Sequence, residues 1–245
     1  MVSKTSNSFS SACQKSTPKH RSLQLNPDIP LIDHRDMVNL GGSISLAHAQ
    51  GNLSVGITDH LATAISCSYG FDHKYYAQGM AGWYRPIGSG VLELYGGFGW
   101  GHGKQYFDPD PGEGAIGNYQ LYYAQADYGW NNLANKHLDI GFALKAGLLH
   151  SDLQRIDPSI IYLPGLMPSN HLLLEPTAQV RVGWEHFKFS IALAFCYLAP
   201  RNRWDSPALF PYDPLNLTLG LTIKLKKMGS INSKVGSKSG SKSGS

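Results

Sequence analysis

The sequence predicts an all-β fold, namely an up-and-down antiparallel β-barrel of about ten strands. Composition is the first reason, because glycine provides 27 of the 245 residues, alongside 13 tyrosines and 5 tryptophans. Charged residues account for only 16% of the chain, whereas ordinary soluble domains hold roughly 25%. This profile argues against a helical bundle and against a disordered chain.

A period of two in the alternation of apolar and polar residues is the second reason. The last such segment, residues 217–225, places leucine or isoleucine at every odd position and Thr, Gly or Lys at every even one. Ten strands are expected, at residues 38–47, 50–58, 61–70, 75–85, 90–101, 116–130, 138–148, 172–184, 187–197 and 217–225.

The lengths of the connections are the third reason. From the middle of the chain onward, short turns at 86–90, 131–136 and 185–187 alternate with long loops at 102–115, 151–170 and 199–214. An up-and-down barrel with tight turns on one rim produces this alternation. Around the barrel (residues 36–227), residues 1–35 are expected to be a flexible polar tail, and residues 228–245 a low-complexity tail or linker.

Hydropathy and aromatic placement suggest where this barrel resides. No run of 18 apolar residues occurs and the mean hydropathy is −0.22, but a membrane-spanning strand needs only about 9–11 alternating residues. Aromatic residues gather near the expected strand ends, as in the two girdles of membrane barrels. The girdle candidates are Trp83, Tyr84, Trp100, Tyr128, Trp130, Trp184 and Tyr197. We therefore expect a transmembrane barrel in contact with the lipids of a bacterial outer membrane, with both termini in the periplasm.

Three motifs within residues 22–103 carry a resemblance to a known family. They are the turn Ile-Thr-Asp-His at 57–60, Gln-Gly-Met-Ala-Gly-Trp-Tyr at 78–84, and Glu-Leu-Tyr-Gly-Gly-Phe-Gly at 93–99. The chain resembles the small outer-membrane β-barrel lipoproteins of the Bacteroidota, a largely uncharacterised family. The resemblance implies a location more than an activity. Gln78 stands where the family usually has an acid, so a lumen partner of that acid must be satisfied differently here.

Cys13 gains a meaning from the same resemblance. Ser10-Ser11-Ala12-Cys13-Gln14 is similar to a lipobox, in which the cysteine is acylated after cleavage. The preceding residues lack the apolar stretch of 7–15 residues that an export signal contains. Two alternatives stay open: the start of the chain is truncated or replaced, or Cys13 is an ordinary thiol in the tail.

Charged residues on the inward faces of the strands form the main candidate site. They are Glu93, Asp127, Asp139, Lys145, Glu175, Arg181, Lys188 and Lys224. Because both signs are present and the lumen of a small barrel is narrow, we expect a network of ion pairs that fills it. Lys145 and Asp139 are the expected partners of Glu175 and Arg181 on the neighbouring strand. A conducting pore is the alternative interpretation.

Five histidines near the long-loop rim are weak candidates for a metal site, but none has ligand spacing such as HxxxH, and we expect no metal. They are His48, His73, His102, His150 and His171. Ser151 lies between His150 and Asp152, yet adjacent strand residues point to opposite faces, so this tripeptide cannot form a triad. We expect no enzymatic activity and no cofactor.

These observations favour a non-enzymatic outer-membrane barrel with a structural or partner-binding role. Its long loops would face another outer-membrane or surface protein. A small-solute channel is one alternative, and a soluble lipocalin-like binding barrel is another. Nucleic acid is not an expected partner, because the chain has no basic patch interleaved with aromatic residues.

Overall fold

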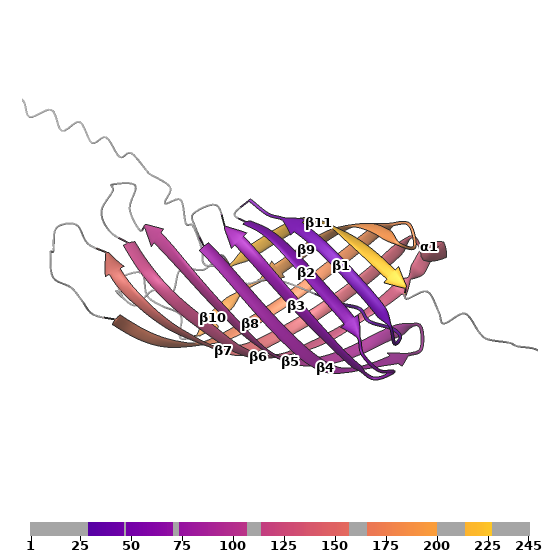
Figure 1. The fold of residues 1–245 in the computed structure, drawn as a ribbon, viewed down its shortest axis with the longest axis horizontal. Coiled ribbons are helices and arrows are strands. Elements are labelled where there is room, and N and C mark those ends of the chain that lie inside the picture. Colours follow the sequence, from indigo (N-terminus) through magenta and orange to yellow (C-terminus); the bar gives the residue numbers. More distant parts are fainter. Residues whose placement is uncertain are drawn as a thin grey trace, which may run out of the picture.

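The computed structural model describes residues 29–46, 48–70, 74–106, 114–156, 166–199 and 214–226. These residues form a single antiparallel sheet wound into a barrel (Figure 1). The strands are β1 (Met37–Ile44), β2 (His48–Gly56), β3 (Leu61–Gly70), β4 (Lys74–Ile87), β5 (Gly90–Tyr106), β6 (Gly114–Asn132), β7 (Leu138–Ile156), β8 (Leu166–Gly183), β9 (Phe187–Phe195), β10 (Tyr197–Ala199) and β11 (Leu215–Lys226). A single turn, α1 (Leu133–Lys136), joins β6 to β7.

Pairing of the first strand with the last closes the barrel. β1 and β11 are antiparallel neighbours from Met37↔Lys226 to Ile44↔Leu219. β1 to β8 pair in chain order, and β9 pairs with β8 and β11. β9 and β10 occupy one position in the wall, because both pair with β8 in the same register. The wall therefore has ten positions, and the predicted closed ten-stranded barrel is confirmed.

Pro176 explains why β9 and β10 are separate strands. The shared register places Pro176 of β8 opposite Phe195, at the point where β9 ends. Proline has no backbone N–H to donate to a neighbouring strand, so the ladder is interrupted for one step. On the other side of the chain, the Cys196 N–H donates to the carbonyl of Pro214, the residue before β11, at 2.9 Å.

The two rims of the barrel differ in height around the circumference. On the short-turn rim, residues 57–60, 88–89, 133–137 and 184–186 connect consecutive strands. On the opposite rim, which we call the long-loop rim, the strands end at different heights. The reason is that β5–β8 are 17 to 19 residues long whereas β1–β3 are 8 to 10. The long strands project beyond their neighbours at that rim (Figure 1).

The projection of β5–β8 shows that two of the expected loops are partly strand. β5 and β6 remain paired out to Tyr106↔Gly114, and β7 and β8 out to Gln154↔Leu166, so much of 102–115 and 151–170 is strand. These stretches lack apolar–polar alternation, but backbone hydrogen bonding with a neighbouring strand holds them extended. Most of the third expected loop, 199–214, lies outside the described residues.

The polarity of the two faces is the reverse of that in a soluble barrel. The outward positions carry exposed apolar side chains along most strands, including Leu40, Ile65, Leu94, Phe98, Tyr122, Phe142, Leu148, Leu172, Phe189, Ile191, Leu217, Leu219 and Leu221. The inward positions hold most of the buried polar and charged side chains. Within the described part of the chain, no helix has the length and apolar character needed to cross a bilayer.

Six of the seven girdle candidates lie at least partly exposed on the outer surface: Trp83, Trp100, Tyr128, Trp130, Trp184 and Tyr197. Two of them, Tyr128 and Trp130, pack edge to face with their ring centroids 4.9 Å apart. Tyr84 contradicts the prediction, because it is fully buried and its hydroxyl donates to the Thr58 carbonyl at 2.6 Å. Strand parity explains this result, since Tyr84 follows the outward Trp83 and must point inward.

The half of the lumen towards the long-loop rim is packed with large side chains. Tyr76 and Tyr119 stack with ring centroids 5.6 Å apart. Gly99 and Gly101 make room for them, because an added Cβ would lie 2.0 Å from the Tyr76 hydroxyl and 2.1 Å from the Tyr119 ring. The leucines of this layer are fully buried: Leu121, Leu149 and Leu173.

Candidate functional site: the filled lumen

All eight charged residues expected in the lumen are buried there, with exposures of 0 to 8%. The set is Glu93, Asp127, Asp139, Lys145, Glu175, Arg181, Lys188 and Lys224. A single buried charge costs several kcal/mol unless it is paired. The arrangement of their partners therefore determines what the lumen can do.

Asp139 is the centre of one group of charges. Its Oδ1 accepts a hydrogen bond from Lys188 Nζ at 2.5 Å, and its Oδ2 forms an ion pair with Lys224 Nζ at 2.7 Å. The Asn132 backbone N–H donates to the same carboxylate at 2.8 Å. Two lysines from β9 and β11 thus converge on one acid from β7, so this group ties three strands together across the barrel interior.

A second ion pair lies further along β7 and β8. Lys145 and Glu175 are cross-strand neighbours, and Lys145 Nζ is 3.3 Å from Glu175 Oε1. The ammonium group also lies 5.0 Å from the centroid of the Tyr123 ring, a cation–π geometry. Lys145 is the partner that the sequence predicts for Glu175.

Gln78 lies in the lumen, and its Oε1 accepts a hydrogen bond from the Tyr76 hydroxyl at 3.2 Å. Closer to the short-turn rim, the Asp127 carboxylate accepts from Gln125 Nε2 at 3.0 Å.

We name residues 29–36 the strap: residues 29–32 are buried inside the short-turn mouth of the barrel, and residues 34–36 are exposed at its rim. Ile29, Leu31 and Ile32 are 0 to 1% exposed, although the sequence places them in a flexible tail that ends at residue 35. The sheet does begin near the expected boundary, at Met37. Burial of three apolar side chains provides roughly 1.5–3 kcal/mol each, which explains why this stretch packs into the lumen.

The Glu93 carboxylate holds the backbone of the strap. The Leu31 N–H donates to Oε2 at 3.0 Å and the Ile32 N–H to Oε1 at 2.7 Å. Leu31 has a φ of 51°, and a left-handed residue in such a segment turns consecutive N–H groups towards one anion. Glu93 is directly opposite Asp127 in the sheet, so these two N–H groups offset the repulsion between neighbouring buried acids.

Side chains from three strands donate hydrogen bonds to the carbonyl groups of the strap. Arg181 donates to the Ile29 carbonyl, and Asn39 Nδ2 donates to the Pro30 carbonyl at 2.8 Å. Asn131 Nδ2 donates to the Leu31 carbonyl at 2.8 Å. Arg181 therefore binds the strap, and it lies opposite Asp139, its expected partner, in the register of β7 and β8.

Glycines in the wall make room for the apolar side chains of the strap. Gly129 and Gly141 are directly opposite each other on β6 and β7. A Cβ at Gly141 would lie 3.1 Å from Ile29 and 3.2 Å from Leu31. A Cβ at Gly129 would lie 2.6 Å from Leu31. The pair forms a recess in the wall that only glycine leaves open.

The four described histidines among the metal candidates divide between the two faces of the wall. His48 and His171 are 3% and 4% exposed in the lumen, whereas His102 and His150 lie on the outer face. Among the described residues, no group of three or more His, Cys, Asp or Glu side chains is arranged to hold a metal ion. His73 lies outside the described residues, as does Cys13.

Ser151 faces the lumen and is fully buried, while its neighbours His150 and Asp152 project outward. The Ser151 hydroxyl lies 2.6 Å from the Ser169 hydroxyl, and His150 Nδ1 lies 2.7 Å from Asn170 Oδ1. The serine and the histidine are therefore separated by the wall. This placement agrees with the strand-parity argument against a triad.

The strap and its partners were missed by sequence reasoning. Asn39 and Asn131 carry no charge and lie at strand ends, where no alternation distinguishes them. The available signal was Ile29-Pro30-Leu31-Ile32, a compact apolar run in an otherwise polar stretch. Such a run near a barrel predicts burial, but its partners depend on the closed wall.

Comparisons with known proteins show a distant likeness. No protein-family model matches the chain, and no curated protein matches it. The KdgM porin is 9% identical, with a TM-score of 0.36 and coverage of 76% of this chain and 98% of the porin. For the NanC porin the values are 10%, 0.36, 77% and 99%. The N-terminal β-barrel domain of Pseudomonas aeruginosa OprF is 11% identical, with a TM-score of 0.30 and coverage of 78% and 98%. The chain's own strand pairings establish its closed barrel.

The buried pair Lys145–Glu175 yields a test of the ion network. We expect Glu175→Gln or Lys145→Met alone to lower the free energy of unfolding by about 3–5 kcal/mol, because each leaves a buried charge unpaired. The double variant should lose clearly less than the sum of the two. Equilibrium unfolding in detergent micelles measures this coupling.

The exposed pair Lys136–Glu185, with a separation of 3.1 Å, is the matched control. Its coupling should not exceed about 1 kcal/mol. Strictly additive losses at Lys145 and Glu175 would show that their contact contributes no pairing energy.

Proposed function

We propose that this chain is a non-enzymatic outer-membrane β-barrel with a closed lumen, which has a structural or partner-binding role at its long-loop rim. The outer-membrane lipids surround its wall. Another outer-membrane or surface protein is the partner. Both termini of the barrel lie at the short-turn rim, which in this proposal faces the periplasm.

The inverted polarity of the wall is the observation that carries the proposal. Leu219 on the outer face is 53% exposed, while the adjacent Thr218 is 5% exposed in the lumen, and this contrast recurs along most strands. In water such a surface would be a large exposed apolar patch. In a bilayer it is the expected lipid-facing surface of a barrel.

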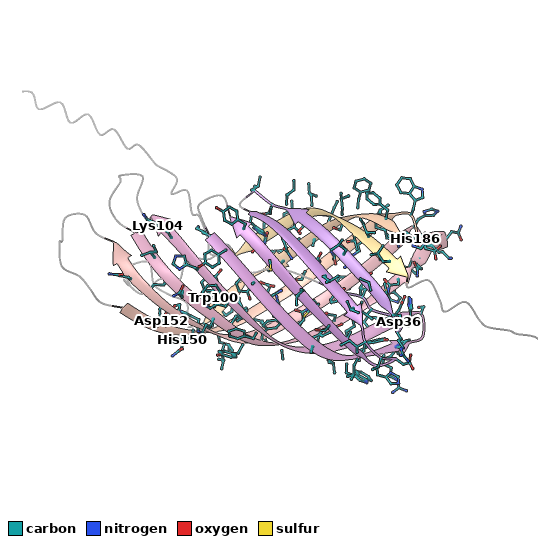
Figure 2. The ribbon with its side chains drawn as sticks, viewed as in Figure 1. Asp36, Trp100, Lys104, His150, Asp152 and His186 are labelled. Atoms are coloured by element: carbon teal, nitrogen blue, oxygen red, sulfur yellow. The ribbon has the colours of Figure 1, made fainter. Side chains whose placement is uncertain are left out.

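The outer face of β6–β8 also changes sharply from apolar to polar. Tyr122, Leu148 and Leu172 are cross-strand neighbours, and the next outward position on each strand is Gln120, His150 or Asn170. Figure 2 shows His150 and Asp152 near the projecting end of the barrel, opposite the end where Asp36 and His186 lie. This row marks the expected boundary of the hydrocarbon region, and the projection beyond it is the surface available to a partner.

Packing of the lumen supports the closed state over the small-solute channel. The strap fills the short-turn mouth, the Lys145–Glu175 pair lies deeper, and a layer with Leu121, Leu149 and Leu173 lies beyond it. A water-filled channel needs polar side chains in contact with water, as in porins. Here the inward charges are almost completely buried.

A substitution at the centre of the outer face tests the membrane orientation. Leu219 lies mid-strand in β11, between Ile44 and Ile191 of the neighbouring strands. Leu219→Arg should lower the free energy of unfolding from lipid vesicles by about 2–4 kcal/mol. The control Ile87→Arg, at the turn end of β4, should cost about 0–1 kcal/mol. Equal costs at the two positions would contradict the proposed orientation.

Conductance distinguishes the closed barrel from the channel. The full-length protein, inserted into planar bilayers and shown to be folded by heat-modifiable gel mobility, should give no stepwise ohmic currents. The physical reason is that the inward side chains are packed and almost completely buried, which leaves them out of contact with water. Reproducible current steps from the wild-type protein would favour the small-solute channel and would overturn the closed state.

Acylation of Cys13 is the remaining part of the proposal, and it is supported by the resemblance of residues 10–14 to a lipobox in the lipoproteins of the Bacteroidota. With a lipoprotein export signal in front of the chain, we expect incorporation of radiolabelled fatty acid. Cys13→Ser should abolish the label and leave heat-modifiable mobility unchanged, because the barrel wall inserts without the tail. An unlabelled wild-type protein would eliminate the lipoprotein assignment.

A further inference from the structure

The hydrogen bonds that hold residues 29–32 of the strap are made to their backbone atoms. Glu93 binds the N–H groups of residues 31 and 32, while Arg181, Asn39 and Asn131 bind the carbonyls of residues 29–31. Every peptide carries these N–H and carbonyl groups, apart from the missing N–H of proline. The polar part of the site therefore does not depend on the side chains of residues 29–32.

The apolar part of the site selects the size and polarity of the occupant. The recess at Gly129 and Gly141 accepts the side chains of Ile29 and Leu31, and an added Cβ at Gly56 would lie 3.0 Å from the Ile32 side chain. Uncharged aliphatic side chains fit such recesses without loss of hydrogen bonds. The site thus takes a short aliphatic segment.

The strap can leave without disrupting the sheet. Residues 29–33 belong to no strand, and the Asp36 N–H to Gly56 carbonyl bond, at 3.0 Å, links its last residue to the wall. A competing peptide therefore has no strand pairing to break.

Buried side chains lie deeper in the lumen than the strap, among them the Lys145–Glu175 pair and the leucines Leu121, Leu149 and Leu173. The short-turn rim is therefore the direct approach to the residues that hold the strap.

We propose that Glu93, Arg181, Asn39 and Asn131, together with the glycine recess, form a peptide-binding site that the strap occupies in cis and an aliphatic segment of another chain occupies in trans. This inference goes beyond the role of the long-loop rim and does not depend on it. It assigns a second partner surface, at the opposite end of the barrel.

The test uses the full-length protein in detergent micelles with the strap displaced. Leu31→Asp with Ile32→Asp places two carboxylates beside Glu93 and in the aliphatic recess, so the strap should leave the mouth. The probe is a fluorescein-labelled peptide with the sequence of residues 28–34, Asp-Ile-Pro-Leu-Ile-Asp-His. We expect saturable binding to this variant, at least about tenfold tighter than to the wild type, whose tethered strap competes at high effective concentration.

Two further substitutions in the displaced variant separate specific binding from general apolar association. Glu93→Gln should weaken peptide binding about tenfold or more, because it removes a charged acceptor of two N–H groups. Gly96→Val, on the outer face where an added Cβ meets nothing within 4 Å, should leave binding unchanged. Absence of saturable binding in a folded displaced variant, or equal binding after Glu93→Gln, overturns the proposal.

Hydrogen exchange in the wild type provides a second measurement if the displaced variant does not fold. An excess of unlabelled peptide should accelerate exchange of the Leu31 and Ile32 amides, since a displaced strap loses their bonds to Glu93. Unchanged exchange at saturating peptide would overturn the proposal. Heat-modifiable mobility and the Leu219→Arg comparison report on membrane insertion separately, so failure of either proposal is recognised on its own.

Discussion

Hydrogen bonding between β1 and β11 closes the sheet, and the other features of the barrel depend on this closure. In a bilayer the backbone N–H and C=O groups find no water, so a sheet with a free edge is not stable there. Closure brings Met37–Ile44 beside Leu219–Lys226, across most of the length of the chain. It also separates an outer face that can be apolar from an inner face that holds the charges.

A wall of ten strands encloses an interior space that has to be filled by side chains or by another segment of the chain. Side chains fill a barrel of about eight strands almost by themselves, and a wider barrel leaves more space. This protein fills the space with stacked tyrosines, a leucine layer, ion pairs and the strap. The strap also donates two N–H groups to Glu93, which is opposite the buried Asp127, so the same segment fills space and stabilises a buried carboxylate.

The two ends of the barrel consequently have different character. At the long-loop rim, β5–β8 project beyond the apolar band and present polar outer side chains. At the short-turn rim, the strap lies within a mouth built from β1, β5, β6, β7 and β8, where the polar contacts to residues 29–32 are directed at their backbone. The partner proposed for the first end would meet the edge and face of strands, whereas the peptide proposed for the second would meet residues that the chain's own strap already occupies.

The sequence by itself determined the all-β class, the ten wall positions, the strand parity and therefore which charges face inward, because a period of two is a local property of each strand. It also predicted the Lys145–Glu175 contact, since the two lie on strands joined in sequence. Only the tertiary structure decided that Asp139 binds Lys188 and Lys224 while Arg181 binds the strap. Those partners come from strands that meet across the lumen only after closure, and residues 29–36 have no partner at all until the wall surrounds them.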